Sequence, residues 1–191
     1  FHPQSRDLQR ALEPFVRATG SRLLEAAQAP AEALGRGGKV LFFGNGGSAA
    51  EAQHLSAELV NRMTYDRPAL ASLALSTDTS ALTSIANDAS YEQVFARQVE
   101  ALGRPGDVAV ALSTSGNSAS ILRGLEAASR GGLVTIALLG RDGGLARSLV
   151  QVPLIVEAAS TARIQEVHLF AGHLLCEAVE RILHPAPGAE I

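Results

Sequence analysis

Short apolar segments that run directly into loops of small residues most constrain the fold of this chain. Segment 39–43 (KVLFF) leads into 44–48 (GNGGS), and segment 107–112 leads into 113–118 (STSGNS). An apolar run without polar alternation is typical of a strand that is buried on both faces. We therefore predict strands at both places. Further strands are predicted at 71–75, 133–139 and 150–156. Pro153 places the last of these at a sheet edge, because proline cannot donate a ladder hydrogen bond.

Helical segments separate the predicted strands, with apolar residues three or four positions apart. These helices are predicted at 49–63, 80–86, 91–102, 119–130 and 161–183. Strands that alternate with helices predict an α/β fold, a three-layer sandwich whose parallel sheet is flanked by helices. In such folds ligands bind at the carboxyl ends of the strands. The loops at 44–48 and 113–118 are therefore the first candidates for a binding site.

Two further helices, 5–20 and 21–34, are predicted before the first strand, with an apolar stripe that begins at Leu8. We expect residues 1–36 to form a helical arm that packs in an oligomer. Residues 37–191 are expected to form a single folded domain.

Composition excludes several functional classes. The 191 residues include a single cysteine, so neither an intrachain disulfide nor a cysteine-rich zinc site can form. A net charge of −3 argues against a broad nucleic-acid surface, and the absence of tryptophan argues against a stacking platform. No apolar stretch approaches membrane-spanning length. We expect a soluble, cytoplasmic protein without direct nucleic-acid or membrane binding.

Both loops suit a phosphate group. Glycines at 44–48 let backbone N–H groups converge at a helix N-terminus, and 113–118 places four hydroxyls at the equivalent point of another strand. The first loop matches neither the dinucleotide fingerprint nor the P-loop pattern. The hydroxyls could instead cap the helix that starts at 119. Four of them after one buried strand favour anion binding.

A separate set of polar residues could bind a metal or transfer protons. His54 and Glu58 lie four residues apart and share one helix face. Gln165 and His173 lie eight residues apart on the last helix, about 12 Å along its axis. Nitrogen and oxygen ligands of this kind suit zinc above all. Each residue alone is also compatible with an ordinary structural role.

Four motifs in this order resemble the phosphoheptose isomerases of the sugar isomerase (SIS) domain family. They are 44–48, Ala52-Gln53-His54 with Glu58, 113–118, and Arg163-Ile164-Gln165-Glu166 with His173. The resemblance covers about residues 8 to 184. It implies a five-stranded parallel sheet and a homotetramer with active sites between subunits. It also implies isomerisation of sedoheptulose 7-phosphate to D-glycero-D-manno-heptose 7-phosphate, the entry to heptose for lipopolysaccharide or related glycans.

The resemblance also implies roles for individual residues. Those that would contact the substrate are Asn45, Gly46, Gly47, Ser48, Glu58, Asn87, Asp88, Ser113, Thr114, Ser115, Ser118 and Gln165. The ligands of one zinc ion per active site would be His54, Glu58, Gln165 and His173. A ketose–aldose interconversion needs a base and an acid, and Glu58 and His173 are the candidates for these roles. Glu58 cannot easily be a tight metal ligand and a free base at once.

Two departures from the family pattern leave other functions open. Glu51 stands where aspartate is usual, and Ala162 where a polar residue is common in some members. Parts of the sequence also resemble a non-catalytic tetrameric relative that binds the replication initiator DnaA. A third alternative is a domain that only senses a sugar phosphate. Neither alternative needs both Glu58 and His173, so their joint presence favours the isomerase.

Overall fold

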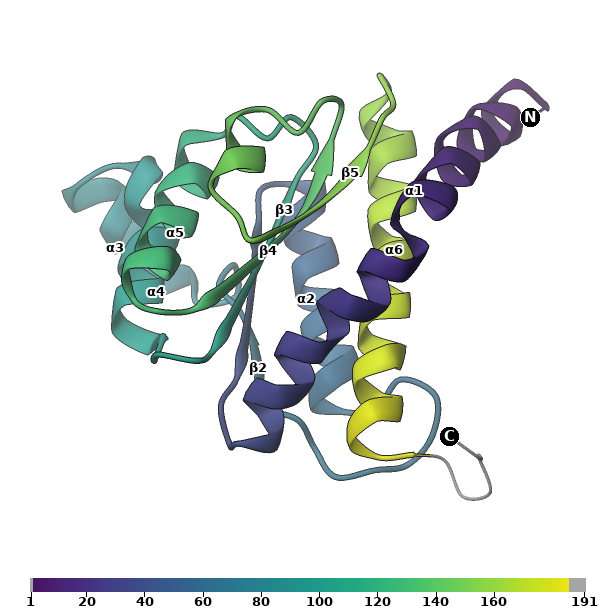
Figure 1. Ribbon diagram of the computed structural model, residues 1–191. Helices are drawn as coiled ribbons and strands as arrows, with labels where there is room; N and C mark the ends of the chain where they lie inside the picture. Colours follow the sequence, from purple (N-terminus) through teal and green to yellow (C-terminus); the bar gives the residue numbers. More distant parts are fainter. Residues whose placement is uncertain (1, 186–191) are drawn as a thin grey trace.

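The computed structural model describes residues 2–185. Its strands are β1 (Val40–Gly44), β2 (Ser72–Ala74), β3 (Val108–Ser113), β4 (Val134–Gly140) and β5 (Val152–Val156). Within this part of the chain they form one parallel five-stranded sheet (Figure 1), and hydrogen-bond pairing gives the order β2-β1-β3-β4-β5. Each strand overlaps a predicted one to within two residues at either end. Pro153 lies in an edge strand, as predicted.

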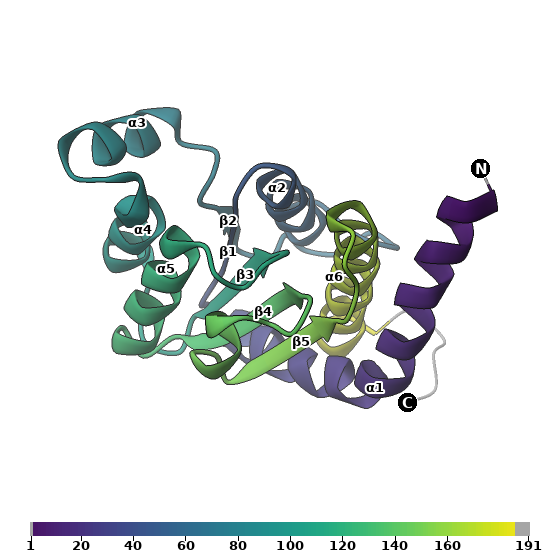
Figure 2. The ribbon, with the colours of Figure 1, turned by 90° about the horizontal axis from the view of Figure 1, so that it is seen from above.

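Helices cover both faces of the sheet. They are α1 (His2–Gly35), α2 (Gly47–Val60), α3 (Thr79–Asp88), α4 (Val94–Leu102), α5 (Ala119–Arg130) and α6 (Thr161–Leu183), with short 3-10 turns η1 (Tyr91–Gln93) and η2 (Leu145–Ser148). Figure 2 shows α1, α2 and α6 on one face and α3, α4 and α5 on the other. The fold is therefore the predicted three-layer α/β sandwich.

Successive strand residues pack alternately into two hydrophobic cores, one on each face of the sheet, because neighbouring side chains point to opposite faces. Val40 and Phe42 of β1 pack beneath α1, α2 and α6. Leu41 and Phe43 of the same strand pack beneath α4 and α5. All four side chains are buried, which explains why this segment of the sequence shows no polar alternation.

The prediction of two helices before the first strand is wrong, because α1 is one continuous helix of 34 residues. Gly20, at the predicted break, lies inside it, with open space where a Cβ would lie. A glycine in a helix costs about 1 kcal/mol. Burial of Phe15 and Leu23 on either side, against α6, offsets that cost. The role of this helix in an oligomer stays a prediction.

No helix among residues 2–185 has both the length and the apolar character needed to span a bilayer.

Candidate active site

The two small-residue loops leave the sheet side by side. Gly44, the last residue of β1, pairs with Leu112 near the end of β3. Asn45 then joins the loops, because its side-chain amide donates to the hydroxyls of Ser118 and Ser120, each at 2.9 Å. The carboxyl ends of two adjacent strands thus present one continuous polar surface, at the place where ligands bind in such folds.

Glycines keep the first loop tight. Gly46 has a φ of 57°, a conformation that side chains rarely adopt, and it directly precedes α2. A Cβ on Gly47 would overlap the side-chain amide of Gln165 from α6. The first turn of α2 therefore lies against Gln165, and Ser48 is buried there.

The hydroxyls of the second loop are used in different ways. Ser113 accepts a hydrogen bond from the backbone N–H of Gly116 at 3.1 Å, which closes the turn. Ser115 accepts in the same way from Asn117 at 3.2 Å, while Thr114 is half-buried in the loop. Ser118 is the N-cap residue of α5, yet its side chain makes no capping bond. Its hydroxyl contacts Asn45 instead, so helix capping does not explain this residue.

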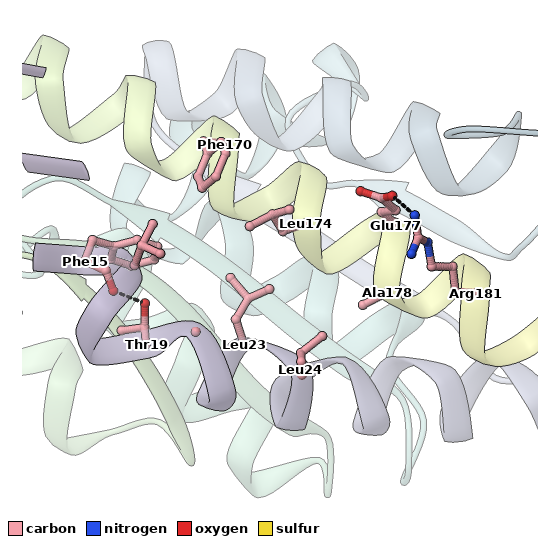
Figure 3. A pocket seen from close by; sticks show the side chains of 11 residues that line it. Phe15, Thr19, Leu23, Leu24, Phe170, Leu174, Glu177, Ala178 and Arg181 are labelled. Carbon is pink, nitrogen blue, oxygen red and sulfur yellow. Dashed lines mark hydrogen bonds and ion pairs between the residues drawn. The ribbon is translucent and has the colours of Figure 1, made fainter. Parts of the chain in front are cut away.

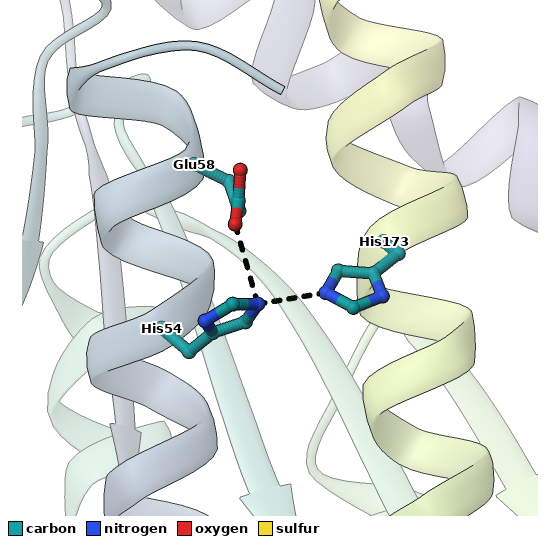
Figure 4. Close-up of side chains that lie close together, drawn as sticks. All are labelled: His54, Glu58 and His173. Carbon is teal, nitrogen blue, oxygen red and sulfur yellow. Dashed lines mark hydrogen bonds and ion pairs between the residues drawn. The ribbon is translucent and has the colours of Figure 1, made fainter. Parts of the chain in front are cut away.

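His54, Glu58 and His173 come together between α2 and α6 (Figure 4). The Nε2 atoms of the two histidines are 2.7 Å apart, and Nε2 of His54 lies 3.3 Å from Oε1 of Glu58. Burial and the neighbouring His54 lower the pKa of His173, and Glu58 partly opposes this change. Two imidazoles and a carboxylate so arranged can share a proton or converge on a cation.

The donor atoms of this trio fit a divalent metal. One nitrogen from each histidine and one carboxylate oxygen lie within 4.8 Å of one another. Zinc prefers nitrogen and oxygen donors in this combination. Gln165, the fourth predicted ligand, contacts Gly47 instead, and Gly47 lies seven residues, about 10 Å, before His54 along α2. Its place among the ligands stays a prediction.

Asn87 and Asp88 lie at the exposed end of α3, where the Asn87 amide donates to the Asp88 carboxylate at 2.8 Å. A tyrosine that sequence analysis missed connects this region to the loops. The hydroxyl of Tyr91 donates to Oδ1 of Asn45 at 2.8 Å. Tyr91 is exposed, so no apolar periodicity marks it. Its position depends on how η1 packs against α3, α4 and α5, which the sequence pattern does not encode.

Two ionisable side chains near the site are deeply buried. Glu51 lies one turn before Leu55 on α2, and burial raises its pKa to about 7 although the Ser48 hydroxyl opposes the change. Burial also lowers the pKa of His168 on α6 to about 4. The ring of His168 lies near the Leu139 backbone without reaching standard hydrogen-bond geometry.

A hollow of about 310 Å³ lies between α1 and α6, away from the predicted site residues (Figure 3). Apolar side chains from both helices line most of it, among them Leu23 and Leu174. Leu24 at its rim is 62% exposed. An apolar face of this kind marks an interaction surface more often than a catalytic centre.

Comparison with known proteins adds an independent observation. A family profile described as SIS domain matches residues 5–140. The phosphoheptose isomerase of Paramagnetospirillum magneticum is 55% identical over 174 residues, 91% of this chain and 86% of that protein. The phosphoheptose isomerase of Halorhodospira halophila is 48% identical over 191 residues, 98% of this chain and 94% of that protein. The solved structure of phosphoheptose isomerase GmhA from Neisseria gonorrhoeae superposes with a TM-score of 0.88 at 41% identity, covering 94% of this chain and 96% of that one.

Proposed function

The chain belongs to the phosphoheptose isomerases of the SIS-domain family, and from this premise we propose how its residues catalyse the reaction. The enzyme is an aldose–ketose isomerase that converts sedoheptulose 7-phosphate to D-glycero-D-manno-heptose 7-phosphate. Similarity to isomerases over most of the chain favours this function over the initiator-binding scaffold and the sugar-phosphate sensor.

The phosphate end of the substrate binds at the two loops. The first loop would bind the phosphate through backbone N–H groups at the start of α2, and the second through the hydroxyls of 113–118. The hydrogen bonds from Asn45 to Ser118 and Ser120 support this role, because they join the two loops into one polar surface. Gln165 lies over Gly47, and its proposed role is to contact the sugar next to the phosphate.

Glu58 acts as the base and His173 as the acid. Glu58 removes a proton from C1 of the ketose, and His173 donates a proton to the oxygen on C2, which gives an enediol. Return of a proton to C2, with loss of the proton from the oxygen on C1, completes the aldose. The observation that carries this proposal is the approach of Glu58 and His173 to the same His54 nitrogen from two different helices.

We also propose that His54, Glu58, Gln165 and His173 hold one zinc ion in each active site. The trio of nitrogen and oxygen donors supports this assignment. Bound there, zinc would polarise the sugar carbonyl and stabilise the negative charge that develops on its oxygen.

The deciding experiment is turnover of sedoheptulose 7-phosphate by purified protein after chelation, with and without added zinc. Turnover that follows zinc supports the isomerase and the four zinc ligands, and Glu58 then acts as a metal ligand rather than as a free base. Turnover without metal keeps Glu58 and His173 as base and acid and removes the zinc proposal. Absence of turnover in both states, with folded protein, contradicts the proposed function. Glu58→Gln is expected to abolish turnover and leave sugar-phosphate binding nearly intact, and equal loss of both would contradict a purely catalytic role.

A homotetramer with active sites between subunits completes the proposal. The apolar face around the hollow supports it, because Val16, Leu24, Phe170 and Leu174 expose large side chains there. Light scattering after size exclusion measures the assembly, and Leu24→Glu is expected to dissociate it. A monomeric wild-type protein would contradict this part. The cytoplasmic location expected from the sequence stays a prediction.

A further inference from the structure

A fully buried ion pair joins the segment after α2 to the last helix. The side chains of Arg67 and Glu180 are 1% and 0% exposed, and Nε of Arg67 lies 3.0 Å from Oε1 of Glu180. Oε1 also accepts from the N–H of Met63 at 2.9 Å. Oε2 accepts from the N–H of Thr64 at 2.9 Å and from its hydroxyl at 2.5 Å. Burial alone would raise the pKa of Glu180, but these hydrogen bonds hold it below its ordinary value. The carboxylate is therefore ionised and fully bonded.

The other end of Arg67 caps the helix that carries Glu58. Nη2 donates to the backbone carbonyl of Glu58 at 2.8 Å, and Nη1 donates to that of Leu59 at 2.7 Å. The last carbonyls of a helix have no partner within the helix and carry partial negative charge, so a cation there is favourable. One guanidinium thus contacts Glu58's own peptide unit and Glu180 together. Lysine could not span both, because it lacks the planar fork of donors.

Glu180 lies on the same side of α6 as His173, since the two are seven residues, about two turns, apart. At Gly172, the residue directly before His173, an added Cβ would meet the Leu55 side chain of α2 at 2.5 Å. The two helices are thus in close contact beside His173 and are tied together again at Glu180. This second tie is attached to α2 at Glu58 itself.

We propose that the buried Arg67–Glu180 pair is a positioning device that holds Glu58 in register with His173. The inference rests on the proposed function, because it assigns Glu58 and His173 the two proton transfers. Buried ion pairs contribute little net stability compared with apolar side chains, so stability alone is a weak reason for this one. Displacing a catalytic group by about 1 Å can cost about 100-fold in rate. Loosening the pair should therefore lower kcat and leave KM nearly unchanged.

The chain offers a matched control at the far end of the sheet. Asp107 is buried before β3 and accepts from Lys39 Nζ at 2.6 Å, from the Lys39 N–H at 2.9 Å and from the Arg104 N–H at 2.9 Å. Like Glu180, it is a carboxylate bound by one cation and two backbone N–H groups. Asp107→Asn and Glu180→Gln remove equivalent charges, and only the second touches the proposed device.

The test measures kcat, KM and thermal stability for Glu180→Gln, Arg67→Lys and Asp107→Asn, together with hydrogen exchange of residues 57–65. We expect a 10- to 100-fold loss of kcat with KM within twofold for the first two variants, and faster exchange in that segment. Asp107→Asn should lose stability and keep kcat. Thr64→Ala removes only the hydroxyl bond to Glu180 and should lose less kcat, which keeps the test valid if Glu180→Gln fails to fold.

Two results would overturn the proposal. In the first, Arg67→Lys and Thr64→Ala lose no more kcat than the control Asp107→Asn loses. The other is unchanged hydrogen exchange in 57–65 for both of those variants. An inactive wild-type protein would instead contradict the proposed function, and the exchange measurement would still decide whether the pair holds the end of α2.

Discussion

Replacement of the buried Glu51 by glutamine should change how the stability of this protein depends on pH. The residue is 9% exposed, and its Oε2 has no hydrogen-bond partner among residues 2–185. Burial raises its pKa from 4.5 to about 7, and the bond with Ser48 only partly opposes this. The ionised form is therefore disfavoured in the folded state.

The direction of the effect follows from proton binding. Because the folded pKa lies above the unfolded one, the folded state holds the proton more tightly. The resulting stability is complete below pH 4.5 and is lost as the pH rises through about 7. Between pH 5 and pH 8 the loss from this one group is roughly 2 to 3 kcal/mol. Glu51→Gln cannot ionise, so the variant should not show that loss.

The assay is urea unfolding of wild type and Glu51→Gln at pH 5, 6, 7 and 8, with chelator present and protein concentration fixed. The free energy of unfolding of wild type, relative to the variant, should fall by roughly 2 to 3 kcal/mol across this range. Glu92→Gln, which changes an exposed carboxylate, should run parallel to wild type. Parallel curves for Glu51→Gln and wild type would refute the reasoning, because they would show that Glu51 ionises normally in the folded protein.

Three further predictions concern residues around the loops and the last helix. Tyr91→Phe removes the hydrogen bond to Asn45 and should raise KM about fivefold, the equivalent of about 1 kcal/mol, with kcat unchanged. Steady-state kinetics check this prediction, and a change confined to kcat would contradict it. Gly47→Ala forces the Gln165 amide to move and should weaken inorganic phosphate binding by about tenfold or more in calorimetry, whereas unaltered binding would show that Gln165 moves freely. His168 has a folded pKa near 4, below its ordinary 6.5, so its contribution to stability is full above pH 6.5 and is lost as the pH falls toward 4. His168→Leu should be less sensitive to acid than wild type when unfolding is followed at pH 7 and pH 5, and equal sensitivity would argue against a buried neutral ring.

Much of the fold could be predicted because strands buried on both faces leave an uninterrupted apolar signal, as in 39–43 and 107–112. The pair His54 and Glu58 could be predicted to share a helix face from their spacing alone. The approach of His173 could not, since it depends on the packing of two helices that lie more than a hundred residues apart. The single helix α1 was missed because Gly20 resembles a stop signal, and only burial on α6 shows why it is tolerated.

The Arg67–Glu180 pair escaped sequence analysis for a related reason. Two charges 113 positions apart carry no periodicity, and arginine is usually exposed. The proposed role of the pair depends on three facts that only the fold supplies. Both side chains are buried, Arg67 donates to the Glu58 carbonyl, and Glu180 lies on the same side of α6 as His173.

The packing of α1 against α6 joins the first and last helices described in this chain, with a consequence for synthesis. Chains emerge from the ribosome N-terminus first. Helix α1 is complete by Gly35, but the helix that covers its apolar face starts only at Thr161. Through most of translation that face lacks α6, although β1 and β3, which lead into the two small-residue loops, are made well before Thr161. A nascent chain should thus contain both small-residue loops before His173 can reach Glu58. Until α6 is released, the face of α1 that packs on α6 is open to chaperones and to aggregation.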